Sequence, residues 1–253
     1  VVFLSGTPIM NDADSETKAL YHLMKTSNLE NKLFYYDPRT DIKTKGSYAY
    51  TEHVTEYCYM TWAQCFKYLI NRKQTFELQL PYENYKRIRT TSKQFAYNTQ
   101  LRTICNNPYP ETPELSPKLI SLRDNIQSYL DQNMKQIIYS SRRDAGIDAL
   151  DNLLEEDLYR IDGSMSIDER SESIRKFNMK QKSILLITDA GGQGVDLKRV
   201  DVVHLMEPAD SIQEENQIIN RAVRYKSHKE NYSKVIIVHY IMKFPITSQV
   251  SAP

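Results

Sequence analysis

The chain has 253 residues, a formal net charge of +1, 40% hydrophobic residues and 26% charged residues. This length can bury a substantial core in one large or two small domains. No apolar run approaches the roughly 20 residues that a membrane span needs, so the sequence predicts no membrane partner. The small net charge means that any nucleic-acid contact must come from local basic patches.

The three cysteines form no C-x-x-C pair, and the five histidines show no metal-ligand spacing. These patterns argue against a disulfide framework and predict no metal site. They fit a reducing, intracellular compartment.

The first part of the chain has a mixed pattern. An apolar strand is predicted at 1–4, and because no initiator methionine precedes it we expect a fragment of a longer polypeptide. Residues 28–60 predict irregular structure with short strands. Further elements are expected at 61–70 (helix), 76–80 (strand) and 83–105 (helix), and the proline-rich stretch 107–117 is the best linker candidate.

From residue 116 onward, strands and helices alternate. Helices are predicted at about 118–132, 143–155, 166–178 and 212–224, and strands at 136–140, 158–161, 184–188, 201–206 and 234–241. This alternation predicts an α/β fold with a mostly parallel sheet and helices on both faces. Ligands of such sheets bind at the carboxyl ends of the strands, where the glycine-rich loop 188–196 falls.

The predicted helix 212–224 carries Gln217, Arg221 and Arg224 at spacings of four and three. At 3.6 residues per turn, these spacings place the three side chains on one stripe. Two guanidiniums and an amide beside a loop of backbone donors suit a multiply charged phosphate chain. Taken alone, the arginine pair is equally compatible with a solvated basic helix.

A series of motifs, in order from Ser5 to Arg224, resembles superfamily-two helicases and, within them, the Swi/Snf-type DNA translocases. S-G-T-P-I-M-N at 5–11 resembles motif III, and L-R-T-I-C-N-N-P at 101–108 resembles L-R-x-x-C-N-H-P, with Asn107 in place of histidine. S-P-K-L at 116–119 is similar to the opening of the second lobe, and 135–141 to motif IV. Residues 160–164, 169–170 and 177–178 match a spaced pattern of this branch, 188–197 resemble motif V, and 217–224 resemble motif VI.

Residues 220–228 also look like the R-A-x-R-x-x-S-H ending of helicases from nucleocytoplasmic large DNA viruses, with Asn220 in place of glycine. Those helicases include poxvirus-like nucleoside triphosphate phosphohydrolases and early transcription factor subunits.

The resemblance implies a RecA-like parallel sheet at 116–244, which is the second helicase lobe. Residues 1–27 would be the end of the first RecA-like lobe, 28–115 a mixed helical and β insertion that braces the lobes, and 245–253 a tail.

The resemblance also implies roles for individual residues. Arg224 would be the arginine finger, Arg221 a second γ-phosphate partner and Gln217 an accessory contact. Gly192, Gly194 and Asp196 would contribute to ATP binding, although Asp196 is equally compatible with a polar turn. Ser5 and Thr7 would couple the nucleotide state to lobe closure. The residues expected to face nucleic acid are Ser140, Arg142, Gly163, Ser164 and Thr188.

The implied cofactors are ATP and Mg²⁺, held mainly by the first lobe. The sequence contains neither a G-x-x-x-x-G-K-[ST] loop nor a D-E-x-x box, so we expect the 253 residues alone not to hydrolyse ATP. The expected partner is double-stranded DNA, with single-stranded nucleic acid as a second candidate and RNA polymerase or other transcription-complex subunits as protein partners.

The leading hypothesis is an ATP-dependent DNA translocase or helicase with a viral role in transcription or genome handling. Such a protein would act in the virion or the host cytoplasm. The alternatives are a non-catalytic scaffold subunit of a transcription complex and a eukaryotic chromatin remodeller, which would act in the nucleus.

Overall fold

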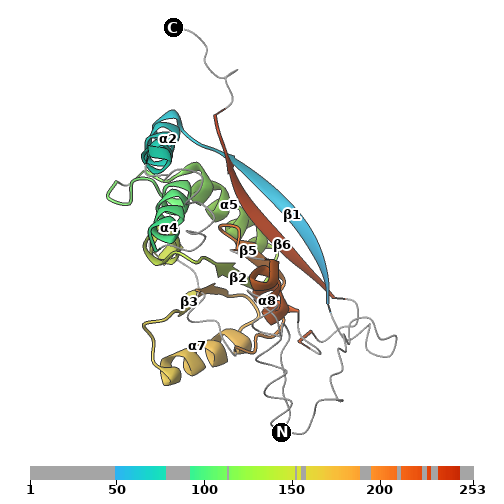
Figure 1. Cartoon of the computed structure of the whole chain (residues 1–253). Helices are drawn as coiled ribbons and strands as arrows, with labels where there is room; N and C mark the ends of the chain where they lie inside the picture. The colour runs from blue at the N-terminus through green and yellow to red at the C-terminus, as the bar shows by residue number, and fades with distance from the viewer. Residues whose placement is uncertain are drawn as a thin grey trace, which may run out of the picture.

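A computed structural model describes residues 49–77, 92–112, 114–151, 153–154, 158–188, 195–209, 212–223, 227–228 and 233–245. These residues contain a six-stranded sheet with the order β1-β6-β5-β2-β4-β3, and every neighbouring pair is parallel (Figure 1). The strands are β1 (Tyr50–Tyr59), β2 (Gln136–Tyr139), β3 (Leu158–Ile161), β4 (Ile184–Ile187), β5 (Val202–Leu205) and β6 (Lys234–Lys243).

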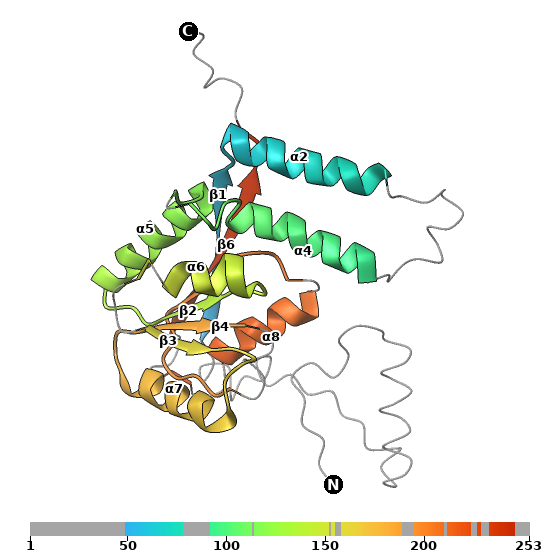
Figure 2. The same cartoon turned by 90° about the vertical axis from the view of Figure 1, so that its left-hand side faces the viewer.

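Helices cover both faces of the sheet. The helices are α2 (Trp62–Glu77), α4 (Ser92–Asn106), α5 (Pro117–Asp131), α6 (Asp148–Asp151), α7 (Ile167–Met179) and α8 (Ile212–Ala222), and a π-helical turn, η2 (Arg143–Ile147), precedes α6. Figure 2 shows α2 and α4 side by side, apart from the main body of the sheet.

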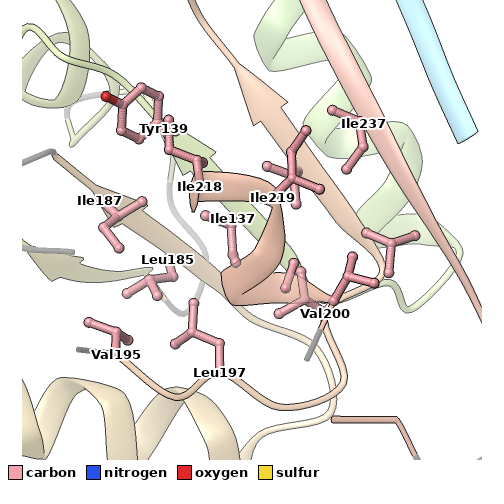
Figure 3. Packing of buried hydrophobic residues seen from close by; sticks show 14 of the residues in the cluster. Ile137, Tyr139, Leu185, Ile187, Val195, Leu197, Val200, Ile218, Ile219 and Ile237 are labelled. Atoms are coloured by element: carbon pink, nitrogen blue, oxygen red, sulfur yellow. The ribbon is translucent and has the colours of Figure 1, made fainter. Parts of the chain in front are cut away.

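Two buried clusters, one on each face of the sheet, form the core. On one face, α5 and α6 pack against the sheet through residues such as Leu122, Ile126 and Leu150. On the other face, Phe177 of α7 and Ile218 of α8 contact strand residues, and Figure 3 shows Ile218 and Ile219 beside Ile137. The strands β2, β4 and β5 are buried along their whole length, which explains why they are continuous apolar runs rather than alternating ones.

The structure confirms the predicted α/β fold, and the elements from residue 116 onward lie close to their expected positions. Ser116 caps α5, since its hydroxyl accepts from the Leu119 N–H at 3.2 Å. Ser166 and Glu169 form the predicted capping box at the start of α7.

Three elements before or within this region differ from prediction. Residues 50–59 form one long strand, paired with β6 from Tyr50↔Lys234 to Tyr59↔Lys243, rather than short strands. Phe76 and Glu77 continue α2, so the predicted strand 76–80 is wrong at its start; its remainder lies outside the described residues. Extending a helix adds a hydrogen bond for each residue fixed, whereas a strand needs a neighbour. Residues 143–151 form a π-turn and a short helix instead of one continuous α-helix.

Residues 1–48 lie outside the described residues, and so do Ser5, Thr7 and the predicted end of a first lobe. Among the helices that the structure describes, none is long and apolar enough to cross a membrane.

A buried hydrogen-bond chain crosses the sheet through His204. The Nε2 atom of His204 lies 2.8 Å from Gln136 Oε1, and its Nδ1 atom lies 2.9 Å from the Tyr240 hydroxyl. Gln136 Nε2 donates to the Ile126 carbonyl, which leaves Gln136 Oε1 as an acceptor. His204 Nε2 therefore carries the proton, and Nδ1 accepts from Tyr240. Burial lowers the pKa of His204 to about 3, so the ring is neutral in the folded protein at neutral pH.

We predict that this histidine makes the fold acid-sensitive. Between pH 6.5, its ordinary pKa, and pH 3, the unfolded chain binds a proton here that the folded chain does not. Stability therefore falls as pH falls through this window, by at most about 1.4 kcal/mol per pH unit from this group. Urea unfolding across the window should show a shallower pH dependence for His204→Gln than for the wild type. Equal slopes for the two proteins would contradict the assignment.

Candidate functional site

The parallel strands bring four chain segments together at the carboxyl edge of the sheet. These segments follow β2 (140–142), β3 (162–165), β4 (188) and β5 (206–207). The edge thus gathers most of the residues predicted to face nucleic acid.

Ser140 differs from its predicted role. It is fully buried, and its hydroxyl donates to Glu207 Oε1 at 2.9 Å. In this structure the hydroxyl is not available for direct contact with phosphate, because it is used inside the protein. Ser140 instead fixes the start of the turn, since its Oγ accepts from the Arg142 N–H at 3.0 Å.

Arg142 and its neighbour Arg143 lie at the surface end of this turn. Arg142 is partly exposed, and its Nε donates to Ser141 Oγ at 3.2 Å. The side chain of Arg143 is 58% exposed, and its Nε lies 3.4 Å from Asp148 Oδ2. Both guanidiniums are placed where a phosphate backbone could be contacted without reading bases.

Gly163 and Ser164 form an exposed turn after β3. The backbone N–H and the hydroxyl of Ser164 both donate to Asp162 Oδ1. Burial alone would raise the pKa of Asp162, but the hydrogen bonds from Ser164 and Arg160 outweigh it and hold the pKa at about 2. Asp162 is therefore charged at neutral pH, and its carboxylate holds the turn through the two hydrogen bonds from Ser164.

Arg160 joins this turn to the segment after β2. Its guanidinium forms ion pairs with Asp148 at 2.6 Å, Asp151 at 2.5 Å and Asp162 at 2.5 Å. Because Asp148 and Asp151 lie on α6, one cation holds the two predicted nucleic-acid loops in a fixed relation.

Thr188 follows β4 and is buried. Its N–H donates to the Ile161 carbonyl at 3.2 Å, while its Oγ1 atom has no hydrogen-bond partner among the described residues. The following loop, with Gly192 and Gly194, lies outside the described residues.

Asp196 lies on a short segment that Asn178 clamps from α7. Asn178 Nδ2 donates to the Asp196 carbonyl at 2.9 Å, and Asn178 Oδ1 accepts from the Lys198 N–H at 2.8 Å. Val195 and Leu197 are buried, so the alternation leaves the Asp196 side exposed, as ligand contact requires.

Lys135 stabilises the same region from beneath. The buried Lys135 Nζ donates to the Phe177 carbonyl at 2.9 Å, at the end of α7, where a cation is favourable. Burial lowers the pKa of Lys135 to about 8.

Gln217 and Arg221 lie one turn apart on α8, and both are partly buried. Ile218 and Ile219 point into the core (Figure 3), and Ala222 belongs to the same buried cluster, so this face of α8 packs against the sheet. An amide and a guanidinium are groups that can bind phosphate, so the ATP contact predicted for these two residues stays a prediction. Arg224 lies outside the described residues.

Ser227 and His228 connect the end of α8 to the segment after Asp196. Ser227 Oγ donates to the Ala222 carbonyl at 3.3 Å, and its own carbonyl accepts from the Arg199 N–H at 2.9 Å. His228 Nε2 donates to the Val200 carbonyl at 2.8 Å. The two predicted ATP-contacting segments are therefore held together by backbone-directed bonds.

The sequence did not reveal the role of Glu207. Two sequence features could have indicated it. Glu207 is an acidic residue that follows an apolar strand, and Asn106 and Lys118, which the structure links to Glu207, lie within recognised motifs. Within the described ranges, no group of three or more His, Cys, Asp or Glu side chains is placed to hold a metal ion.

Part of the chain matches a known protein family and is similar to known proteins. The helicase conserved C-terminal domain family matches residues 118–226. A protein of Acanthamoeba polyphaga mimivirus, named as an ATP-dependent RNA helicase, is 34% identical over 139 residues, which cover 52% of this chain and 30% of that protein. The chromodomain-helicase-DNA-binding protein 1-like of Danio rerio is 31% identical over 141 residues, 49% of this chain and 14% of that protein.

Solved structures show the same fold. The Sulfolobus solfataricus SWI2/SNF2 ATPase core in complex with dsDNA has a TM-score of 0.57 at 21% identity, covering 76% of this chain and 41% of that one. The C-terminal part of the Fun30 ATPase domain has a TM-score of 0.58 at 17% identity, and the match covers 78% of this chain and 86% of that one.

The sheet, its motif-bearing edge and these matches define a helicase C-terminal, RecA-like lobe. Residues 118–226 match the helicase family, and the chain is similar to Snf2-type superfamily-two helicases and to a helicase of a large DNA virus. It spans 30% of the mimivirus relative's length.

We predict that the turn after β2 tolerates no side chain at Gly146. A Cβ there would lie 2.1 Å from Ser140 Oγ and 2.8 Å from Ser140 Cβ. Gly146→Ala should therefore lower the free energy of unfolding by about 1–3 kcal/mol through overpacking. Ile167→Ala is the control, because Ile167 is 81% exposed and its loss should change stability by less than about 0.5 kcal/mol. Chemical denaturation measures both, and an unchanged Gly146→Ala midpoint would contradict the packing.

Proposed function

We propose that this chain is the second-lobe part of an ATP-driven motor that moves along double-stranded DNA. The observation that carries the proposal is that two sets of polar side chains suited to phosphate lie on different elements of one lobe. The loops that present Arg142 and Ser164 gather at the carboxyl edge of the sheet, while Gln217 and Arg221 lie on α8. A motor needs such a division, because nucleotide and nucleic acid must be bound at once.

Hydrolysis of ATP depends mainly on positioning and on neutralising charge at the transferring phosphoryl group. In the proposed mechanism a first lobe, with residues 1–27 at its end, holds ATP and Mg²⁺. Arg221 and Arg224 approach the γ-phosphate when the lobes close, and Gln217 contacts the nucleotide beside them. Mg²⁺ supplies charge neutralisation when bound. The chain by itself is then expected to be inactive, because both lobes are needed.

Double-stranded DNA is the preferred track because the Sulfolobus solfataricus structure is of a complex with dsDNA. Single-stranded nucleic acid is the second candidate, and the mimivirus relative, which is named as an RNA helicase, adds RNA to the candidates. Contacts to phosphate by arginines and backbone donors would make binding largely independent of sequence.

A viral role in transcription or genome handling, in the virion or host cytoplasm, is supported by the mimivirus relative and by the Ser227-His228 ending. Transcription-complex subunits are then the proposed protein partners. The Danio rerio relative supports the alternative of a nuclear chromatin remodeller.

Arg224→Ala in the full-length protein tests the motor. We expect DNA-stimulated ATP turnover to fall about 10³-fold or more, with duplex binding retained, since an arginine finger contributes about 10³–10⁵ in rate. Arg175→Ala is a matched control, because Arg175 is exposed on α7 and pairs only with neighbours on that helix in the described structure. Parallel assays with duplex DNA, single-stranded DNA and duplex RNA identify the track.

Turnover that survives Arg224→Ala would reject the catalytic role. Retained biological function of a variant without turnover would favour the scaffold alternative instead.

A further inference from the structure

Glu207 is a buried carboxylate at the end of β5, and it accepts hydrogen bonds from two other chain segments. Only 3% of the residue is exposed. Its Oε1 accepts from Ser140 Oγ at 2.9 Å, from the Ser141 N–H at 2.6 Å and from Ser141 Oγ at 2.9 Å. Its Oε2 accepts from Asn106 Nδ2 at 2.9 Å. A buried charge is tolerated when it is bonded in this way.

Asn106 connects the carboxylate to a buried cation. Asn106 Oδ1 accepts from Lys118 Nζ at 3.0 Å while its Nδ2 donates to Glu207, so both partners fix the direction of the amide. Lys118 Nζ also donates to the Met206 carbonyl at 2.7 Å. Burial lowers the pKa of Lys118, and the charge of Glu207 opposes that effect. These bonds join the end of α4, the start of α5 and the segment after β5, next to the segment that follows β2.

The two serines relay this anchor to Arg142. Ser140 Oγ donates to Glu207 and accepts from the Arg142 N–H, so the carboxylate orients the Arg142 backbone. Ser141 Oγ donates to Glu207 and accepts from Arg142 Nε, so the same carboxylate orients the guanidinium. In the described part of the chain, the two terminal nitrogens of Arg142 carry no hydrogen bond or ion pair.

We propose that Glu207 is a positioning residue that acts through Ser140 and Ser141 to hold Arg142 in place for phosphate contact. The inference rests on the proposed nucleic-acid function of this edge. Each serine hydroxyl donates a hydrogen bond to the Glu207 carboxylate and accepts one from Arg142. The hydrogen bonds therefore all point from Arg142 through the serines to Glu207. Because Arg142 is already held in place, its side chain loses less conformational entropy on binding nucleic acid than an unrestrained arginine would.

A double-mutant cycle tests the relay in the full chain. Binding of a short fluorescent DNA duplex is measured by anisotropy between about 50 and 200 mM salt. Arg142→Ala should weaken binding about tenfold and reduce the salt slope by about one. Glu207→Gln should also weaken binding and reduce the slope, and the double variant should bind no more weakly than Arg142→Ala, since both changes remove one contact.

Glu172→Gln is the matched control, because it removes the same charge from the exposed face of α7 and should leave affinity unchanged. If Glu207→Gln does not fold, Ser141→Ala provides the same cycle, since it removes only the hydroxyl between Glu207 and Arg142 Nε.

The positioning role would be overturned if the two losses of duplex affinity multiplied in the double variant and Glu207→Gln left the salt slope unchanged. The proposed function would stand in that case. Such a result would assign Glu207 to stability. A full-length wild-type protein that binds no duplex would overturn the proposed function, and this inference with it, so the two failures are distinguishable.

Discussion

The buried carboxylate of Glu207 is the interaction on which the carboxyl edge of the sheet depends. Parallel pairing brings the ends of β2 and β5 together, but pairing alone leaves the segments beyond the strands undefined. Glu207 defines them, because it satisfies donors after β2 and at the end of α4 with one side chain. Removing one partner from a buried charged cluster is costly, which makes this arrangement a strong constraint.

Elsewhere in the lobe, polar and charged side chains also join neighbouring segments through hydrogen bonds and ion pairs. Arg160 fixes the turn after β3 through three carboxylates, and Lys135 fixes the end of α7 through backbone carbonyls. Ser227 and His228 join the end of α8 to the segment that follows Asp196. The segments predicted to face nucleotide and those predicted to face nucleic acid are thus held by hydrogen bonds and ion pairs within one lobe.

Local patterns were sufficient to predict most elements from residue 116 onward, except the continuous helix expected at 143–155. Apolar runs such as Ile184–Ile187 and the capping box at Ser166 are decided by nearby residues. The strand β1 was not predicted as one element, because its partner β6 lies more than a hundred residues later. Ser140 was identified as important, but sequence could not show that its hydroxyl faces inward toward Glu207. The roles of Gln217, Arg221 and Asp196 remain predictions, and Arg224, Gly192 and Gly194 lie outside the described structure.

Hydrogen–deuterium exchange with and without duplex DNA tests most directly whether this edge of the sheet binds nucleic acid. Binding at the edge should slow exchange in peptides covering residues 141–147 and 162–165, the segments that follow β2 and β3. It should leave the exposed strand β1 unchanged. Protection of β1 or of the outer side of α7, with no change after β2 and β3, would contradict the account.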